Sequence, residues 1–242
     1  MSTMPAGSGL TAAPQLALFA DHAKRRTAYD VRAVSQPARA FTGDFYFTHR
    51  HEDRQWLAIG DVAGKGLPAA IVMAMIQEEL EQRIISCANA DCDPSRTVQR
   101  LHEFLLPLLP RNRFATAVIG WLDPDGTLTI ANAGHCPPLI LRANGRVEQI
   151  ASTGPIAGVL PNASWTSVKL RLGEGDSLVL YSDGVTEAEI DGEELGLYGL
   201  TSIIARAPRG GRASDLAAAV LSEIPGHQDD LTLVVVRAGG NA

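Results

Sequence analysis

Residues 57–70 read LAIGDVAGKGLPAA, an apolar run that enters a glycine-rich turn and leaves with the pattern of a helix. Pro68 stands where the first turn of a helix tolerates proline, and apolar residues then recur at helical spacing to about residue 88. This stretch therefore predicts a strand, a tight turn and a helix of about six turns.

The turn invites comparison with a phosphate-binding loop, but two features differ. Three residues rather than four separate Gly60 from Gly64, and Gly66 stands where a serine or threonine would hold magnesium. We therefore interpret Asp61 as the reactive element of the turn and its glycines as the residues that give it room.

The rest of the chain predicts many short strands and two groups of helices. We expect the first three strands to form an antiparallel meander, and turn residues predict three hairpins, around residues 123–126, 143–145 and 173–176. This order favours an antiparallel α+β architecture over a doubly wound parallel sheet. The predicted strands are 29–35, 41–48, 55–60, 115–122, 127–131, 138–142, 146–150, 167–172, 177–181 and 231–236, and the helices are 67–88, 93–106, 199–207 and 214–224.

Composition limits the classes of partner and compartment. Lys and Arg total 21 against 27 for Asp and Glu, which gives a formal net charge of −6. The chain has no dense basic run of the kind that nucleic-acid binding requires. No uncharged apolar run reaches 18 residues, so we expect a cytoplasmic protein without a membrane span. Cys87, Cys92 and Cys136 form no CxxC pair, which argues against a disulfide framework and for small buried side chains in a reducing compartment. We expect residues 1–28 to be a flexible leader with a short helix, and residues 29–242 to be one domain.

Acidic residues stand beside glycine or tight turns at the ends of predicted strands: Asp44, Asp61, Asp183, and the pair Asp229 and Asp230. One such aspartate is most often a turn former, but several in similar settings indicate carboxylates gathered at one edge of a sheet. Clustered carboxylates resist burial unless a cation compensates them, and oxygen ligands select Mg²⁺ or Mn²⁺ over zinc. The pattern therefore predicts a metal pair.

Five segments in order resemble the metal-dependent protein phosphatases of type 2C, in the bacterial branch of stage II sporulation protein E and the sigma-factor regulatory phosphatases. They read TGDFY at 42–46, GDVAGKGLPAA at 60–70, NAGH at 132–135, SDGVTE at 182–187 and DDLT at 229–232. The resemblance covers residues 29–237. It implies two packed antiparallel sheets flanked by helix pairs, and a two-metal centre at one end.

The resemblance also assigns roles to residues. Asp61 would bridge two Mn²⁺ or Mg²⁺ ions, the Val62 carbonyl would bind one of them, and Asp183 and Asp229 would complete the other site. Asp44 would lie close by as a ligand or water holder, and the adjacent Asp230 is also a candidate ligand. The implied substrate is phosphoserine or phosphothreonine on a regulatory partner, with anti-anti-sigma-type domains the first suggestion. Because no sensor domain is visible within 242 residues, we expect any regulation to come from a partner, from formation of a homodimer or from the leader.

One position departs from the family pattern, because Phe47 stands where the family usually has an aspartate. The missing carboxylate would weaken a metal contact, which motivates a rival hypothesis of a non-catalytic regulator that binds a signalling partner. The alternative interpretation is that Phe45 and Phe47 alternate on the apolar face of a strand.

Other residues have weaker claims to chemistry. His135 would serve as a general acid, but a histidine that packs and hydrogen-bonds locally explains it better. A zinc pair of His135 and Cys136 lacks a second pair with ligand spacing. Ser182 lacks the setting of a nucleophile elbow. We interpret Arg113 as a solvated loop charge rather than a phosphate contact.

Overall fold

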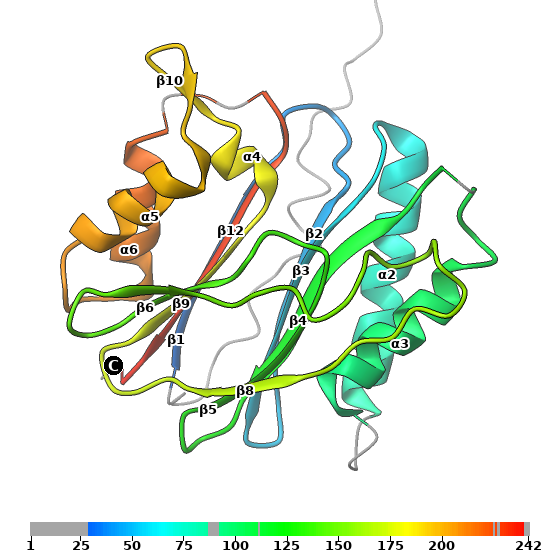
Figure 1. The fold of residues 1–242 in the computed structure, drawn as a ribbon, viewed down its shortest axis with the longest axis horizontal. Coiled ribbons are helices and arrows are strands. Elements are labelled where there is room, and N and C mark those ends of the chain that lie inside the picture. The colour runs from blue at the N-terminus through cyan, green and yellow to red at the C-terminus, as the bar shows by residue number, and fades with distance from the viewer. Residues whose placement is uncertain (1–28, 87–91, 111, 225, 227, 240–242) are drawn as a thin grey trace, which may run out of the picture.

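The computed structural model describes residues 29–86, 92–110, 112–224, 226 and 228–239. Two antiparallel sheets pack face to face, and a pair of helices covers the outer face of each (Figure 1). This confirms the predicted α+β sandwich. The leader expected at residues 1–28 and Cys87 lie outside the described residues, and the domain boundary at residue 29 stays a prediction. Within the described part of the chain, no helix has the length and hydrophobicity needed to cross a bilayer.

The first sheet has the strand order β1-β12-β9-β6-β7. It therefore joins segments that lie far apart in the chain, because β1 pairs with the last strand, β12, and β12 pairs with β9. Its strands are β1 (Tyr29–Gln36), β6 (Leu139–Leu141), β7 (Val147–Gln149), β9 (Ser177–Tyr181) and β12 (Leu231–Ala238).

The second sheet has the order β2-β3-β4-β5-β8, so its first four strands follow one another along the chain. A separate two-stranded ribbon pairs β10 (Glu189–Ile190) with β11 (Glu193–Glu194). The strands of the second sheet are β2 (Asp44–His51), β3 (Arg54–Val62), β4 (Ala115–Leu122), β5 (Thr127–Ala133) and β8 (Val168–Arg171).

Helices α2 (Leu67–Ile85) and α3 (Pro94–Leu105) cover the second sheet, while α5 (Gly196–Arg206) and α6 (Ala213–Ser222) cover the first. Local chemistry explains where the first pair begins. Gly66 adopts a positive φ of 75° immediately before α2, a conformation that glycine reaches without strain. The Asp93 side chain accepts a hydrogen bond from the Ser95 amide and so caps α3.

Strand β12 shows how the layers form, because it is buried on both faces. Leu233 and Val235 belong to the apolar cluster under α5 and α6, whereas Val234 and Val236 belong to the cluster between the two sheets. The two-residue period of a strand places alternate side chains in these two layers. A third cluster fills the space between the second sheet and helices α2 and α3.

Most predicted elements are confirmed, but two predicted strand pairings are wrong. The turn at 173–176 does not close a hairpin, because β8 pairs with β5 in the second sheet and β9 with β12 and β6 in the first. The expected meander is also incomplete, since β2 pairs with β3 but β1 lies in the other sheet. Turn residues fix a local change of direction, but burial and long-range pairing decide which sheet receives the strand.

The cysteine prediction needs a correction. Cys92 is disulfide-bonded, and Cys136 is free. Whether two cysteines can bridge depends on their separation in space, which the absence of a CxxC spacing does not determine. The cysteine pattern therefore gives no argument for a reducing compartment.

Candidate active site

Acidic residues from four segments gather at the end of the sandwich where α4 (Asp183–Thr186) lies (Figure 1). Asp44 opens β2 and stands opposite Asp61, near the end of β3, in the antiparallel register. Asp183 follows β9, and Asp229 precedes β12, the antiparallel neighbour of β9. The second sheet therefore contributes Asp44 and Asp61 to this end, and the first sheet contributes Asp183 and Asp229.

Glycines allow the backbone to approach these carboxylates closely. A Cβ atom on Gly43 would lie 2.7 Å from Asp61 Oδ1 and 2.8 Å from the Val62 carbonyl oxygen. A Cβ on Gly184 would overlap the Asp230 carbonyl. The space in front of Asp61 and the Val62 carbonyl thus stays open only because residue 43 has no side chain.

The pKa values of three of these carboxylates are raised, although only Asp44 is fully buried. Burial, followed by repulsion from Asp183 and Asp229, raises the pKa of Asp61 to about 7. Burial also raises the pKa of Asp44 to about 8, although the nearby side chains of Ser182 and Thr232 lower it, and this residue is 3% exposed. Asp183 shifts in the same direction, first through burial and then through Asp229. Each group therefore resists ionisation without a compensating cation.

Asp230 has a different environment from the other acidic residues. Its Oδ1 accepts a hydrogen bond from the Ala38 amide at 2.9 Å, and its Oδ2 accepts one from the Gly43 amide at 3.2 Å. Its own amide donates to Asp229 Oδ1 at 2.9 Å. The carboxylate of Asp230 therefore fastens the loop between β1 and β2 and positions Gly43 beside Asp61.

The donor set fits a hard divalent cation in its chemistry. The carboxylates that raise one another's pKa present only oxygen, and Asp44 Oδ2 is a buried oxygen without a hydrogen-bond partner in the described residues. Among the described residues, no three or more His, Cys, Asp or Glu side chains are already arranged to hold an ion. The carboxylates therefore lie at one end of the sandwich but do not converge on a single ion position.

A cavity of about 310 Å³ opens at this end of the sandwich. Asp61 from one sheet and Asp183 from the start of α4, after the other sheet, both line it. Its wall is completed by Ala63, Phe114, Thr116, Gly134, His135 and Cys136. Two acidic residues from distant parts of the chain thus face a common space.

His135 and Cys136 are in the wall of this cavity, but neither is charged there. Burial lowers the pKa of His135 to about 4, and burial raises the pKa of the Cys136 thiol to about 12. The backbone of His135 is held by Asn132, whose Oδ1 accepts from the His135 amide and whose Nδ2 donates to its carbonyl. This local hydrogen bonding agrees with the structural interpretation of His135.

Arg113 has a role that the sequence interpretation missed. The Nη1 atom of Arg113 donates a hydrogen bond to the Ala63 carbonyl at 2.7 Å, and a Cβ on Gly64 would overlap the Arg113 guanidinium. Arg113 is therefore not a solvated loop charge, because its side chain packs against the turn that follows Asp61 and hydrogen-bonds to it. The glycine at position 64, which leaves room for this side chain, is the sequence feature that pointed to a close approach.

Phe47 faces away from the acidic residues. It packs with Phe45 against the apolar cluster under α2 and α3, whereas Tyr46, the residue between them, packs against the cluster between the sheets. Asp44 precedes Phe45 and lies on the same side of β2 as Tyr46. A side chain at position 47 therefore points to the helix layer, which supports the interpretation of Phe47 as a core residue.

Comparisons with known proteins agree on one family. The model of the family described as stage II sporulation protein E (SpoIIE) matches residues 51–239. Phosphoserine phosphatase RsbU of Bacillus subtilis (strain 168) is 28% identical over 179 residues, which cover 73% of this chain and 52% of RsbU. This chain thus spans about half the length of that relative.

Solved structures share the fold. The crystal structure of the RsbU and RsbW domains of Rv1364c from Mycobacterium tuberculosis matches with a TM-score of 0.75 and 25% identity, covering 88% of this chain and 62% of that one. The crystal structure of RsbX in complex with magnesium matches with a TM-score of 0.65 and 16% identity, covering 86% and 93%.

Proposed function

This chain belongs to the stage II sporulation protein E family, and on that premise we propose that it is a metal-dependent phosphatase that hydrolyses phosphoserine or phosphothreonine on a partner protein. The observation that carries the proposal is the pairing of Asp61 and Asp183 in one cavity, with the pKa of each raised by burial and by neighbouring acidic residues. Carboxylates held together in this way are stabilised by a divalent cation.

The proposed metal ligands are those that the resemblance to type 2C phosphatases assigns. Asp61 would be shared by two Mn²⁺ or Mg²⁺ ions, the Val62 carbonyl would serve one of them, and Asp183 and Asp229 would serve the other. Such ions supply positive charge that stabilises phosphoryl oxygens and lowers the pKa of a water molecule. Magnesium in the crystal structure of RsbX, which shares this fold, supports the choice of a hard cation.

The remaining acidic residues support this arrangement. Asp44, whose buried Oδ2 has no hydrogen-bond partner in the described part of the chain, would be a further ligand or would hold a water molecule. Asp230 already uses both carboxylate oxygens to accept amides of the β1–β2 loop, so any metal contact would take their remaining lone pairs. We therefore propose that Asp230 acts mainly by holding Gly43 beside Asp61.

The walls of the cavity favour hydrolysis without a covalent enzyme intermediate. The Cys136 thiol stays protonated at neutral pH because burial raises its pKa, so it is a poor nucleophile. Ser182 uses its hydroxyl to donate to the Asp230 carbonyl at 3.1 Å and to accept from the Thr232 amide at 2.9 Å. Neither side chain is thus available to attack phosphorus, and the mechanism that we propose uses a water molecule as the nucleophile.

The substrate class comes from the relatives. RsbU is named a phosphoserine phosphatase, and Rv1364c carries an RsbU domain together with an RsbW domain. We propose that this chain likewise acts on a small phosphorylated regulatory protein, with anti-anti-sigma-type domains as the first class to test. The rival hypothesis of a non-catalytic regulator came from Phe47, and the orientation of Phe47 toward the helix layer removes that motive.

The test is hydrolysis of a phosphoserine peptide by the purified chain after chelation with EDTA. We expect no turnover in EDTA, recovery when Mn²⁺ or Mg²⁺ is added back, and little recovery with zinc, which prefers nitrogen and sulfur ligands. An Asp61→Asn preparation made in parallel controls for contaminating phosphatases. Turnover that survives exhaustive chelation, or that the Asp61→Asn protein retains, would contradict the proposal. A folded protein without metal binding or turnover would favour the regulator.

A further inference from the structure

His135 is a buried histidine in the wall of the cavity that Asp61 and Asp183 share. His135 is 8% exposed. The Asn132 side chain holds the backbone of His135 by hydrogen bonds to the His135 amide and to the His135 carbonyl. The segment therefore holds the imidazole in one place, between the strand ends that carry the two aspartates.

One nitrogen of the ring contacts the strand next to Asp61. His135 Nδ1 and the Thr116 hydroxyl are 2.8 Å apart, and Thr116 stands directly opposite Asp61 in the β3–β4 register. A shift of the ring relative to the second sheet would therefore strain a hydrogen bond one strand away from Asp61.

The other nitrogen, Nε2, is buried and has no hydrogen-bond partner within the described residues. Burial keeps the ring neutral, so one ring nitrogen carries a proton and the other accepts, and the Thr116 hydroxyl can pair with Nδ1 in either role. The polar contact of the ring is therefore with Thr116, in the sheet that carries Asp61.

We propose that His135 is a positioning residue that, through its hydrogen bond with Thr116, fixes the strand end carrying Asp61 where Asp61 shares the cavity with Asp183. Apolar side chains fill most of the space between the sheets, and their attraction has no preferred direction. The hydrogen bond between His135 and Thr116 supplies the direction that apolar packing lacks at this end of the second sheet. The inference rests on the proposed metal centre, since partners behind the ligands tune metal affinity.

The opposing interpretation is that His135 is only a satisfied core residue, and His102 offers a matched control. His102 is fully buried, its Nδ1 accepts a hydrogen bond from the Gly158 amide at 2.9 Å, and its Nε2 also lacks a partner in the described residues. It packs beside Trp165 in the cluster under α2 and α3, and it is not one of the residues that line the cavity. Replacing His102 therefore tests whether the loss of a buried, hydrogen-bonded histidine away from the cavity affects metal binding.

The experiment measures Mn²⁺ binding to the full chain by electron paramagnetic resonance of the free ion, for the wild type, His135→Phe and His102→Phe. We expect His135→Phe to weaken Mn²⁺ binding by at least about 10-fold, the lower range for loss of a partner behind a metal ligand. His102→Phe should leave Mn²⁺ binding unchanged even where it lowers the melting temperature by as much.

A second variant keeps the inference testable if His135→Phe does not fold. Thr116→Val removes the hydroxyl that contacts Nδ1 while keeping the shape of the side chain, and we expect it to weaken Mn²⁺ binding in the same direction by a smaller factor. Wild-type Mn²⁺ affinity in both His135→Phe and Thr116→Val, or in Thr116→Val alone where His135→Phe does not fold, would overturn the inference. Equal weakening by His102→Phe would also overturn it.

The readout separates this inference from the proposed function. If the wild type binds Mn²⁺ but hydrolyses no phosphoester, the proposed activity fails while the binding comparison still judges His135. If the wild type binds no Mn²⁺, the metal centre fails and the role of His135 is overturned with it.

Discussion

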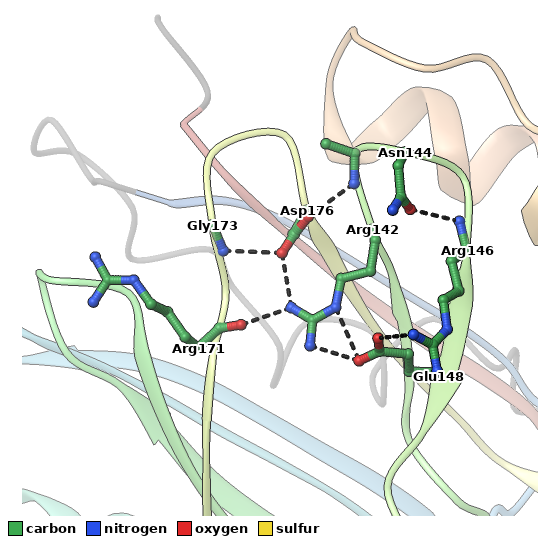
Figure 2. A network of polar contacts seen from close by, with 8 residues as sticks. Arg142, Asn144, Arg146, Glu148, Arg171, Gly173 and Asp176 are labelled. Carbon is green, nitrogen blue, oxygen red and sulfur yellow. Dashed lines mark hydrogen bonds and ion pairs between the residues drawn. The ribbon is translucent and has the colours of Figure 1, made fainter.

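Strand β9 has an aspartate near each end, and the two carboxylates have opposite surroundings. Asp176 precedes the strand and accepts hydrogen bonds from the Ala143 amide at 2.8 Å, the Gly173 amide at 2.9 Å and Arg142 at 2.8 Å (Figure 2). Burial raises its pKa, but these donors outweigh burial and lower the pKa. Arg142 also donates to Glu148 at 2.6 Å, so every charge in this network has a partner.

Asp183, beyond the other end of β9, has backbone donors at Gly184 and at its own amide, but they do not offset burial and repulsion. Burial and the charge of Asp229 raise its pKa, and Asp61 across the cavity is raised as well. The first network fastens the crossing from the second sheet to the first at the β6–β7 hairpin. The second group adds repulsion that the fold does not need. Carboxylates whose donors outweigh burial serve the fold, whereas carboxylates whose burial and mutual repulsion outweigh their donors are the candidates for a cation site.

Replacing Asp61 in the acidic group and Asp176 in the Arg142 network should produce the largest effects, one on activity and the other on stability. We expect Asp61→Asn to lower phosphatase activity by more than about 100-fold, since loss of a partner behind a ligand already costs about 10–100-fold. Its melting temperature in metal-free buffer should stay near or above wild type, because repulsion is relieved. Asp176→Asn should keep its activity and lose about 1–3 kcal/mol of unfolding free energy. Assays of activity and thermal unfolding on both proteins would contradict this contrast if Asp61→Asn destabilised the fold more than Asp176→Asn.

Phe47→Asp asks whether a new carboxylate on β2 joins the acidic end or only disrupts the core. Because Phe47 packs against the cluster under α2 and α3, we expect a loss of about 2–4 kcal/mol in unfolding free energy. The Mn²⁺ concentration for half-maximal activity should not change. Phe47→Leu, which keeps the position apolar, is the control. A clear drop in the Mn²⁺ requirement of a stably folded Phe47→Asp protein would show instead that position 47 reaches the metal centre.

The pH dependence of stability should distinguish the two ends. The pKa of Asp61, raised to about 7 in the folded protein, means that the folded state holds a proton that the unfolded state has lost above pH 4. The metal-free protein should therefore lose stability as pH rises from about 4 to about 7, by up to about 1.4 kcal/mol per pH unit for each proton held. The lowered pKa of Asp176 has the opposite sign and costs stability only in acid.

Saturating Mn²⁺ should remove the loss of stability at neutral pH, and Asp61→Asn should make it shallower. Urea unfolding of the metal-free protein between pH 5 and 8 measures the slope. Stability that stays flat or rises across this range would contradict the account of the acidic end.

The smallest effect should come from the exposed member of the Arg142 network. Arg146 is 74% exposed and lies 3.6 Å from Glu148, so we expect Arg146→Ala to cost less than about 1 kcal/mol. Arg142→Ala should cost several times more, because it leaves the buried Asp176 without its cation. Equal losses in the two proteins, measured by chemical unfolding, would show that the hydrogen-bonded position of Arg142 has no special value.

Local chemistry in the sequence predicted much of this fold. Asp93 and Pro94 predicted the start of α3, and the glycines around Asp61 predicted a strand, a tight turn and a helix. The sequence could not show that β8 and β9 part at the turn before Asp176, because that turn is compatible with both sheets. Burial separates them, since β9 is buried throughout and β8 is largely exposed.

The acidic end was predictable in part. The position of each aspartate at a strand end follows from apolar runs beside glycine, and the structure confirms that placement. Their roles as ligands stay a prediction. The roles of Asp230 on the Gly43 amide and of Arg113 on the Ala63 carbonyl were not predictable, because they depend on contacts between residues far apart in the chain.

The most direct measurement is calorimetric titration of Mn²⁺ into the metal-free wild type, Asp183→Asn and Asp176→Asn. These proteins differ at the two ends of one strand. We predict that the wild type and Asp176→Asn bind two ions with the same affinity, and that Asp183→Asn loses at least one of them. Failure of the wild type to bind Mn²⁺, or unchanged binding by Asp183→Asn, would contradict the claim that the uncompensated end of β9 is a metal centre.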